Sequence, residues 1–416
     1  MKYVARVTDA ELADRLKSAG AVLIEGPKAC GKTETARRQA PSEVRLDIDA
    51  QAREAAEVAP ELILNQTAPL LLDEWQLAPS LWNQVRRAVD DRQRPGQFIL
   101  TGSASPSDDV TRHSGAGRFS VMRMRPMSLA ESGHSTAAVS LRSLLTGQTQ
   151  GARDAGLTVP ALADLITIGG WPAWRGMNPQ AVSRAARDYL TQISHVDVPG
   201  VDGQRRNPTK VDALLRSLAR NIATEVAITT LAKDTAGVEE TMDRETASAY
   251  LAVLERLMVV ENQPAWAPAM RSKVQLRSSP KRHFVDPSLA VAALRSSPSK
   301  LLSDLESMGL LFESLVVRDL RVLSQPLDGQ VLHYRDNKGL EVDAVVTTGD
   351  GAWGAFEVKL GQSRVDDAAA TLLAFARKID TTRCGEPGVL AVITATGLAY
   401  RRRDGVHVVP IGTLGP

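Results

Sequence analysis

The segment GPKACGKT, residues 26–33, has the residue types and spacing of a loop that binds nucleotide phosphates. It matches G-x-x-x-x-G-K-[ST] and lies between an apolar run and a helical pattern. Gly26 and Gly31 allow the backbone to curl, so that N–H groups at a helix N-terminus face the phosphates. Lys32 is expected to reach the β- and γ-phosphates, and the Thr33 hydroxyl to bind Mg²⁺. The predicted ATP contacts are Gly26, Pro27, Lys28, Ala29, Cys30, Gly31, Lys32, Thr33 and Glu34.

A second apolar run, PLLLDEW, ends in the carboxylates Asp73 and Glu74. An apolar strand followed by two carboxylates is typical of a Walker-B element. Asp73 is predicted to hold Mg²⁺ through water, and Glu74 to orient or deprotonate the attacking water. A P-loop kinase has less need of the second carboxylate, so Glu74 favours hydrolysis over transfer. The sequence lacks an N-K-x-D motif, which argues against guanine specificity.

Three further residues have candidate roles at this site. Thr101 and Ser103 follow the apolar run QFIL, where a polar side chain can hydrogen-bond the attacking water. Arg118, in SGAGRFS, is a candidate to offset transition-state charge at a neighbouring subunit's γ-phosphate, and the alternative is an ordinary surface or ion-paired arginine. Cys30 is either an oxidation-sensitive thiol or, more simply, a small filler residue of the loop.

A second set of carboxylates stands near the C-terminus, in GLEVDAVVTTGDGAWGAFEVKLG. A hairpin symmetric about Asp350 places Asp343 opposite Glu357 and Glu341 opposite Lys359. Two opposed carboxylates repel each other unless a proton or cation lies between them. A second divalent metal, Mg²⁺ or Mn²⁺, is one solution, and Lys359 would then activate a water or stabilise developing charge. The alternative is a solvated strand face.

A basic stretch precedes this domain. Residues 262–285 contain no acidic residue, and Trp266 and His283 are interleaved with the cations. In a winged-helix ribbon these cations would contact nucleic-acid phosphates, and the alternative is a solvated loop. The candidate nucleic-acid residues are Arg271, Lys273, Arg277, Lys281 and Arg282.

The elements that position these residues follow from hydrophobic patterning. In the first third, short apolar strands alternate with helical patterns, which is typical of a parallel α/β sheet. Predicted strands cover 21–26, 43–47, 69–75, 97–102 and 119–124. A helix with Ala247, Tyr250 and Leu254 on one face and Asp243 as N-cap belongs to the middle. A long helix at 310–323, four strands (331–334, 341–346, 352–358 and 389–394) and a helix at 366–379 follow.

These patterns divide the chain into four predicted units: a P-loop core at 1–131, a helical lid and connector at 132–205, a winged-helix-like unit at 206–300, and a mixed α/β unit at 301–416. Length agrees, because 416 residues exceed one ordinary core. Net charge is only +2, so any surface for DNA must be local. Two cysteines, no signal-peptide pattern and no membrane-length apolar run predict a cytoplasmic protein without membrane contact.

Taken together, these motifs resemble a family of bacterial and archaeal AAA-type ATP-binding proteins with a C-terminal domain of unknown function. The matching text is GPKACGKT, LLLDEWQ, FILTGSAS, RMRPMSLAE, GGWPAW and EVDAVV…FEVKLG. The last of these follows the D…(D/E)-x-K pattern of the PD-(D/E)XK nucleases, and Glu313 matches the acidic residue that those enzymes place on their first helix. The resemblance implies an AAA-like core, a winged-helix-like middle and a restriction-endonuclease-like end. No sensor-2 arginine is evident, so the sequence does not assign a ring-forming homo-oligomer.

Two hypotheses follow. In the first, ATP hydrolysis drives a DNA-associated activity, with metal-dependent nucleic-acid cleavage by the C-terminal domain. In the second, ATP controls a switch, and an inactive nuclease-like domain recognises DNA or a protein. Polynucleotide-stimulated turnover distinguishes the first from the second.

Overall fold

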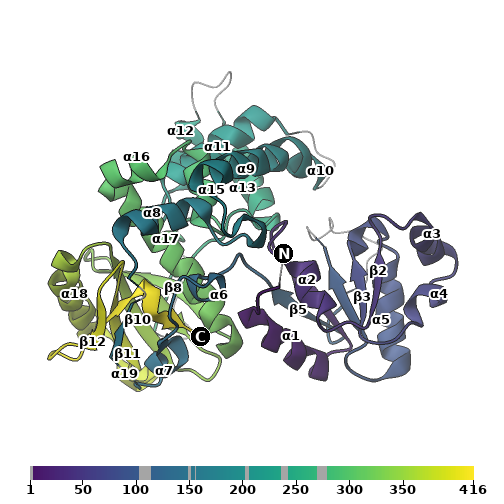
Figure 1. The fold of residues 1–416 in the computed structure, drawn as a ribbon, viewed down its shortest axis with the longest axis horizontal. Coiled ribbons are helices and arrows are strands. Elements are labelled where there is room, and N and C mark those ends of the chain that lie inside the picture. The colour runs from purple at the N-terminus through teal and green to yellow at the C-terminus, as the bar shows by residue number, and fades with distance from the viewer. Residues whose placement is uncertain are drawn as a thin grey trace.

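The computed structural model describes residues 3–102, 114–148, 151–154, 156–201, 206–235, 242–268 and 279–416. The chain forms a sheet-based N-terminal unit, a group of helices and a second sheet-based unit at the C-terminus. Figure 1 shows the N-terminal unit on one side, the C-terminal sheet on the other, and the middle helices above the latter. The α/β architecture predicted from the sequence is confirmed.

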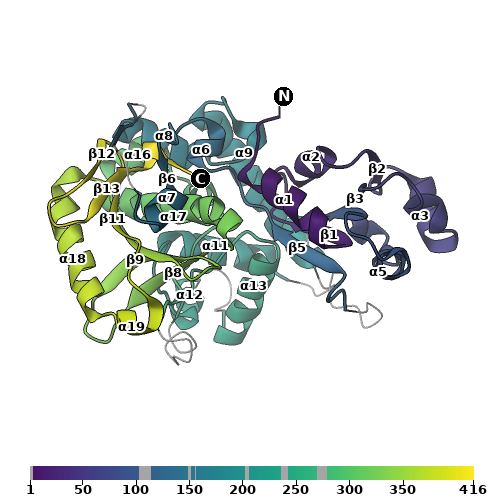
Figure 2. The same cartoon turned by 90° about the horizontal axis from the view of Figure 1, so that it is seen from below.

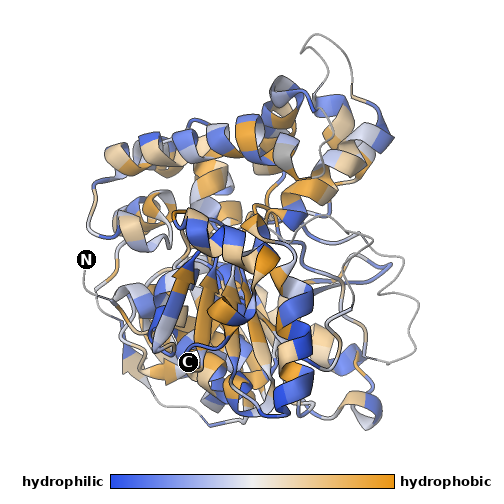
Figure 3. Cartoon of the chain, turned by 90° about the vertical axis from the view of Figure 1, so that its right-hand side faces the viewer, coloured by the Kyte–Doolittle hydropathy of each residue, from blue (hydrophilic) through white to orange (hydrophobic). Residues whose placement is uncertain are grey.

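The N-terminal unit is a five-stranded parallel sheet in the order β2-β3-β4-β1-β5. Its strands are β1 (Ala21–Glu25), β2 (Ser42–Arg45), β3 (Leu70–Asp73), β4 (Phe98–Thr101) and β5 (Phe119–Arg123). The central strands β1, β3 and β4 are buried almost throughout, as their apolar runs predict, and they carry the hydrophobic colour in Figure 3. The accompanying helices are α1 (Val7–Ser18), α2 (Lys32–Arg37), α3 (Ala50–Val58), α4 (Glu61–Leu64) and α5 (Leu81–Arg92).

The middle of the chain is mainly helical. Helix α13 buries Ala247, Tyr250 and Leu254, and Asp243 caps it by accepting a hydrogen bond from the Thr246 N–H at 2.6 Å, both as predicted. A narrow antiparallel ribbon follows, with Val260 opposite Phe284 and Gln263 opposite Lys281. The helices are α8 (Val159–Ile168), α9 (Pro179–Gln192), α10 (Val198–Gly200), α11 (Pro208–Arg220), α12 (Ile228–Asp234), α13 (Arg244–Arg256), α15 (Pro287–Ala293) and α16 (Pro298–Ser303).

The C-terminal unit is a seven-stranded mixed sheet in the order β7-β12-β13-β11-β10-β9-β8. Figure 2 shows α18 (Val365–Lys378) on its outer side and α17 (Leu305–Ser324) on the side toward the rest of the chain. The pairing of Trp353 with Thr347 and of Phe356 with Ala344 confirms the predicted hairpin symmetric about Asp350. The strands are β8 (Gln330–Arg335), β9 (Glu341–Thr347), β10 (Trp353–Lys359), β11 (Val389–Thr394), β12 (Leu398–Arg401) and β13 (His407–Pro410). The short α19 (Thr381–Cys384) precedes β11, and β14 (Leu414–Gly415) follows β13.

Short strands lie at the start of the segment that was predicted as the helical lid and connector, residues 132–205. After α6 (Leu129–Ser132), β6 (Val139–Ser140) pairs with β14, and after α7 (Leu141–Leu145), β7 (Ala152–Arg153) pairs with β12 at the edge of the C-terminal sheet. A two-residue strand leaves almost no periodic signal, so the sequence alone does not reveal it. Within the described residues, no helix is long and apolar enough to cross a membrane.

Candidate functional site

The phosphate-binding loop connects β1 to α2, as its sequence predicts. Gly31 adopts φ 107°, a left-handed conformation that favours glycine, and Lys32 begins α2. A Cβ on Gly26 would overlap the Met124 carbonyl oxygen, so glycine is needed there for space. The Lys32 side chain is buried, and its Nζ donates to the carbonyl oxygens of Gly26 and Pro27, both at 2.9 Å. The ammonium group therefore closes the loop on itself.

Asp73 connects the loop to the neighbouring strands. Its Oδ1 accepts a hydrogen bond from Thr33 Oγ1 at 2.9 Å and another from Thr101 Oγ1 at 2.6 Å. These residues meet because β1, β3 and β4 are adjacent and parallel, so their carboxyl ends share one edge of the sheet. The side chain of Asp73 is buried and has neutral hydroxyl donors around Oδ1. The arrangement brings the hydroxyls of Thr33 and Thr101 to one carboxylate oxygen.

A cavity of about 630 Å³ lies above the loop. Glu74 contributes to its lining and adopts a left-handed backbone, with φ 54°. A second cavity of about 440 Å³ adjoins the first, because Gly31, Glu34, Pro172 and Ala173 line both. The first cavity is lined by Lys28, Ala29, Gly31, Lys32, Thr33, Glu34, Asp47, Glu74, Leu77, Pro172 and Ala173. Besides the four shared residues, the second cavity is lined by Tyr3, Val4, Arg6, Thr35, Met127 and Arg175.

The helical region contacts the loop directly. Lys28 forms an ion pair with Asp197 at 2.5 Å, and the Tyr189 hydroxyl donates to the Lys28 carbonyl oxygen at 3.4 Å. The sequence GGWPAW, residues 169–174, supplies Pro172 and Ala173 to the cavity wall. A nucleotide in the cavity would therefore touch both the sheet unit and the helices.

Three predicted residues lie away from this cavity or outside the described residues. Ser103 falls in the latter group. Cys30 is fully buried, and its thiol lies 3.7 Å from the Met124 carbonyl oxygen, which fits a filler residue. Arg118 precedes β5 at the amino-terminal edge of the sheet, opposite the edge that carries the loop. Its Nε donates to Asp90 at 2.8 Å, so it serves no role at its own chain's loop.

The predicted C-terminal residues do come together. Lys359 Nζ lies 2.6 Å from Glu357 and 3.2 Å from Asp343, and the Val358 N–H donates to Asp343 at 2.9 Å. Lys281 joins them from the middle of the chain, with its Nζ 2.6 Å from Glu313 and 3.4 Å from Asp343. We call Lys281, Glu313, Asp343, Glu357 and Lys359 the carboxylate–lysine cluster.

Burial and charge shape the protonation of this cluster. Burial raises the pKa of Glu313 to about 7, and the neighbouring Asp343 adds to the shift. Burial and Asp343 likewise raise the pKa of Glu357 to about 8. Burial alone would raise the pKa of Asp343, but Lys281 and Lys359 outweigh it and hold that pKa below its usual range. Asp343 is therefore the carboxylate that stays ionised between the two lysines.

The arrangement is that of an internally neutralised cluster. Among the residues that the structure describes, no group of three or more acidic, histidine or cysteine side chains is arranged to hold a metal ion. The ammonium groups of Lys281 and Lys359 take up the carboxylate oxygens instead. The second divalent metal predicted from the sequence has no preformed site in this conformation.

The basic stretch also differs from its prediction. Lys281 and Arg282 are buried, and Arg282 contacts Asn262 at 2.7 Å and Glu255 at 3.5 Å, so neither is presented to a nucleic acid. The reason is the ribbon, whose inward side chains meet α17 and the C-terminal sheet. Arg271, Lys273 and Arg277 lie outside the described residues. The run of basic residues in the sequence does not show which carboxylates they contact, so it did not reveal this burial. The available signal was the set of three C-terminal carboxylates, Glu313, Asp343 and Glu357, with which a buried lysine could pair.

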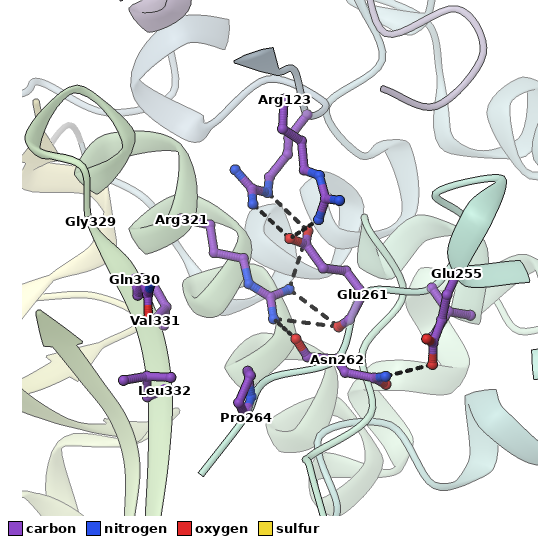
Figure 4. A pocket seen from close by; sticks show the side chains of 12 residues that line it. Arg123, Glu255, Glu261, Asn262, Pro264, Arg321, Gly329, Gln330, Val331 and Leu332 are labelled. Atoms are coloured by element: carbon purple, nitrogen blue, oxygen red, sulfur yellow. Dashed lines mark hydrogen bonds and ion pairs between the residues drawn. The ribbon is translucent and has the colours of Figure 1, made fainter. Parts of the chain in front are cut away.

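A further ionic group lies where the three parts of the chain meet. Arg125 donates to both carboxylate oxygens of Glu261, at 2.9 and 2.6 Å, and Arg321 Nη2 donates to the Asn262 carbonyl oxygen at 2.9 Å. Arg123 also reaches Glu261, at 3.3 Å. Figure 4 shows Arg123 and Arg321 on either side of Glu261, and Arg125 also lines the cavity of about 460 Å³ beside them. This junction joins β5, the ribbon and α17.

Comparison with known proteins gives matches to family models over three segments of the chain. Residues 18–133 match the family model described as AAA domain, so this part is an AAA-type domain of the P-loop ATPase kind. Residues 159–300 match a model described as Domain of unknown function (DUF8612), and residues 308–414 match Domain of unknown function (DUF4143). The nuclease-like character of the C-terminal domain is not established by these matches.

Relatives and solved structures are distant. An uncharacterized protein of Mycobacterium bovis and one of Mycobacterium tuberculosis are each 26% identical over 363 residues, covering 84% of this chain and 72% of the relative. A Walker-type ATPase of Pyrococcus abyssi gives a TM-score of 0.41 at 12% identity, covering 68% of this chain and 94% of that one. A STAND protein with a tetratricopeptide repeat sensor from Pyrococcus horikoshii gives 0.21 at 13% identity, covering 77% and 47%. TM-scores this low do not establish a shared overall fold.

Proposed function

We propose that the chain binds and hydrolyses Mg-ATP at the loop of residues 26–33 and uses the nucleotide state as a switch for its other parts. The observation that carries the proposal is Asp73, which accepts hydrogen bonds from Thr33 and Thr101 beneath a cavity lined by Lys32 and Glu74. A loop, a metal-directed carboxylate and a second carboxylate meet at one sheet edge. This is the set of parts that phosphoryl transfer to water requires.

The residues present fit Mg-ATP. Thr33 and Asp73 would hold the cation, which supplies charge neutralisation of the phosphates when bound. The backbone of Gly26–Thr33 would bind the phosphates, and Lys32 would exchange its two carbonyl partners for phosphate oxygens. Glu74 would orient a water molecule and accept its proton. Thr101, whose hydroxyl donates to Asp73, would hydrogen-bond that water.

The experiment compares binding with turnover. Lys32→Ala should weaken ATP binding, because it removes the ammonium group from the loop. Glu74→Gln should keep binding and lower turnover by about 10²–10³-fold, because the proton acceptor is lost. Glu61→Gln, the same change at an exposed glutamate of α4, should leave both unchanged. Unaltered ATP affinity in Lys32→Ala would remove the basis of the proposal.

The switch, rather than a constitutive nuclease, is favoured by the carboxylate–lysine cluster. Lys281 occupies the space between Glu313 and Asp343 with short contacts, where a cleavage mechanism would need a metal ion. Recognition of DNA or of a protein by the C-terminal domain is compatible with this cluster, whereas metal-dependent cleavage requires it to open. ATP turnover that rises severalfold with added polynucleotide would instead favour a DNA-associated motor or nuclease.

A continuous set of polar contacts supports communication between the parts. Arg6 donates to the Cys30 carbonyl oxygen at 2.9 Å and to Glu131 at 3.0 Å. Two residues from Glu131, the Leu129 N–H donates to Asp319 of α17 at 2.9 Å. Helix α17 carries Glu313 of the cluster. The nucleotide loop and the cluster are thus connected through Arg6, α6 and α17, which is a physical route for coupling.

A further inference from the structure

Gln76 follows Glu74 by two residues, and its amide is held at the catalytic edge of the sheet. Its Nε2 donates a hydrogen bond to Glu74 Oε2. The turn that carries Gln76 is the 3₁₀ segment η1 (Trp75–Leu77), in which the Leu77 N–H donates to the Glu74 carbonyl oxygen at 3.0 Å. Trp75 anchors this turn, because its ring is buried and lies 5.1 Å from that of Trp82. The amide is therefore fixed by the fold rather than free to turn in solvent.

Gly102, the residue after β4, makes room for this amide. A Cβ built on Gly102 would overlap Gln76 Oε1. The backbone of Gly102 does not have the positive φ that favours glycine, so the small residue is required here by space. Oε1 is buried and accepts no hydrogen bond. Leaving Oε1 without a hydrogen-bond partner costs stability. We therefore attribute the position of this amide to the hydrogen bond that its nitrogen donates.

The nitrogen restrains a residue whose own backbone is unusual. Glu74 has φ 54° and ψ 43°, a conformation that a non-glycine residue adopts at a cost of about 1 kcal/mol or more. Such strain is found where the surrounding structure holds a functional group in place. A neutral amide donor can fix one carboxylate oxygen without the full charge that a lysine or arginine would place beside it.

We propose that Gln76 is a positioning residue for hydrolysis: it holds the Glu74 carboxylate in the orientation that activates water, and Gly102 leaves the space that this requires. The inference rests on the proposed function of Glu74. It also links the tip of β4 to the catalytic carboxylate, because any movement of the backbone at Gly102 toward β3 displaces the Gln76 amide.

The test is the steady-state and single-turnover kinetics of the full chain. Gln76→Leu should lower kcat by about 10–100-fold and leave KM and nucleotide affinity within twofold, because the phosphate-binding loop is untouched. Gly102→Ala should reproduce this loss without altering Gln76, since the added methyl group pushes the amide away. Gln84→Leu on α5 is the matched control and should retain wild-type kinetics.

A double-mutant cycle separates positioning from general damage. In the Glu74→Gln background, Gln76→Leu should cause no further loss, because Gln76 acts only through that carboxylate. Equal losses in both backgrounds, or wild-type kcat in folded Gln76→Leu, would overturn the inference. If Gln76→Leu does not fold, Gly102→Ala carries the same cycle. Wild-type turnover in Glu74→Gln would instead defeat the proposed function, whatever Gln76 does.

Discussion

The two ends of the chain use the same residue types, aspartate, glutamate and lysine, in opposite ways. At the nucleotide loop, Oδ1 of Asp73 is met by the hydroxyls of Thr33 and Thr101, which are neutral donors. In the carboxylate–lysine cluster, Asp343 lies 3.4 Å from Lys281 and 3.2 Å from Lys359. The first carboxylate is bound by neutral donors, whereas the second forms ion pairs with two lysines of the same chain.

The difference shows why a motif alone does not assign a site. A carboxylate beside neutral donors attracts a cation, whereas one beside lysines has its cation already. The neighbours of Asp73 come from the end of β4 and from the start of α2, which follows β1, so they follow from strand order. The neighbour that closes the cluster, Lys281, comes from a ribbon 62 positions before Asp343. We expect the two regions to respond differently to substitution, and three changes test this.

The largest expected effect on turnover tests whether the ATP site needs an arginine from a second copy of the chain. Arg118 lies about five strand residues, roughly 17 Å, from the loop edge of its own sheet, so it can serve only a second copy. If copies associate, Arg118→Ala should lower turnover by about 10³-fold at concentrations where they do, and keep ATP binding. Turnover per chain should be measured across a dilution series. Arg86→Ala, which removes the other arginine near Asp90, is the control.

Turnover in Arg118→Ala that equals wild type at every concentration would end the role in trans. The ATP site would then need no residue from a second copy. The contrast between the nucleotide loop and the carboxylate–lysine cluster would hold within a single chain.

The second change compares two acidic residues of β9. Asp343 lies between two lysines with its side chain 13% exposed, whereas Glu341 pairs with Arg335 at 3.1 Å with both side chains about half exposed. Asp343→Ala should lower the free energy of unfolding by about 3–5 kcal/mol, because it leaves buried lysines without their shared partner. Glu341→Ala should cost at most about 1 kcal/mol. Urea unfolding of both variants measures the difference, and similar losses would show that the cluster is solvated.

The sequence predicted the N-terminal sheet, and the position of the loop at its edge, for a physical reason. Functional residues directly follow an apolar strand at three places, the segments GPKACGKT, LLLDEW and FILTG. A short stretch of sequence therefore predicts both where these residues lie and what chemistry they could do. The C-terminal hairpin was predictable because its two strands are adjacent in sequence. Lys281, β7 and the Glu261 junction were not, since each depends on contacts between segments far apart in the chain.

The smallest effect is the pH dependence of the junction. Burial raises the pKa of Glu261, but Arg125, Arg321 and Arg123 outweigh it and hold that pKa well below its usual range. The folded state binds this proton less tightly than the unfolded state does. The contribution of the ionised Glu261 carboxylate to the free energy of unfolding is therefore complete above about pH 4.5 and is lost as pH falls below it. Glu261→Gln should lack this loss, so its unfolding free energy should approach that of wild type by at most about 1.4 kcal/mol per pH unit.

Urea unfolding of both proteins between neutral pH and the acid limit measures that difference, and Glu255→Gln, at a second glutamate of the same cavity, is the control. If the unfolding free energies of wild type and Glu261→Gln change in parallel with pH, the three arginines gain no stabilisation from the ionised carboxylate. The junction would then resemble an exposed ion pair. Converging curves would make it the acid-sensitive contact between the nucleotide-binding sheet and α17, and therefore the place where low pH uncouples the two regions first.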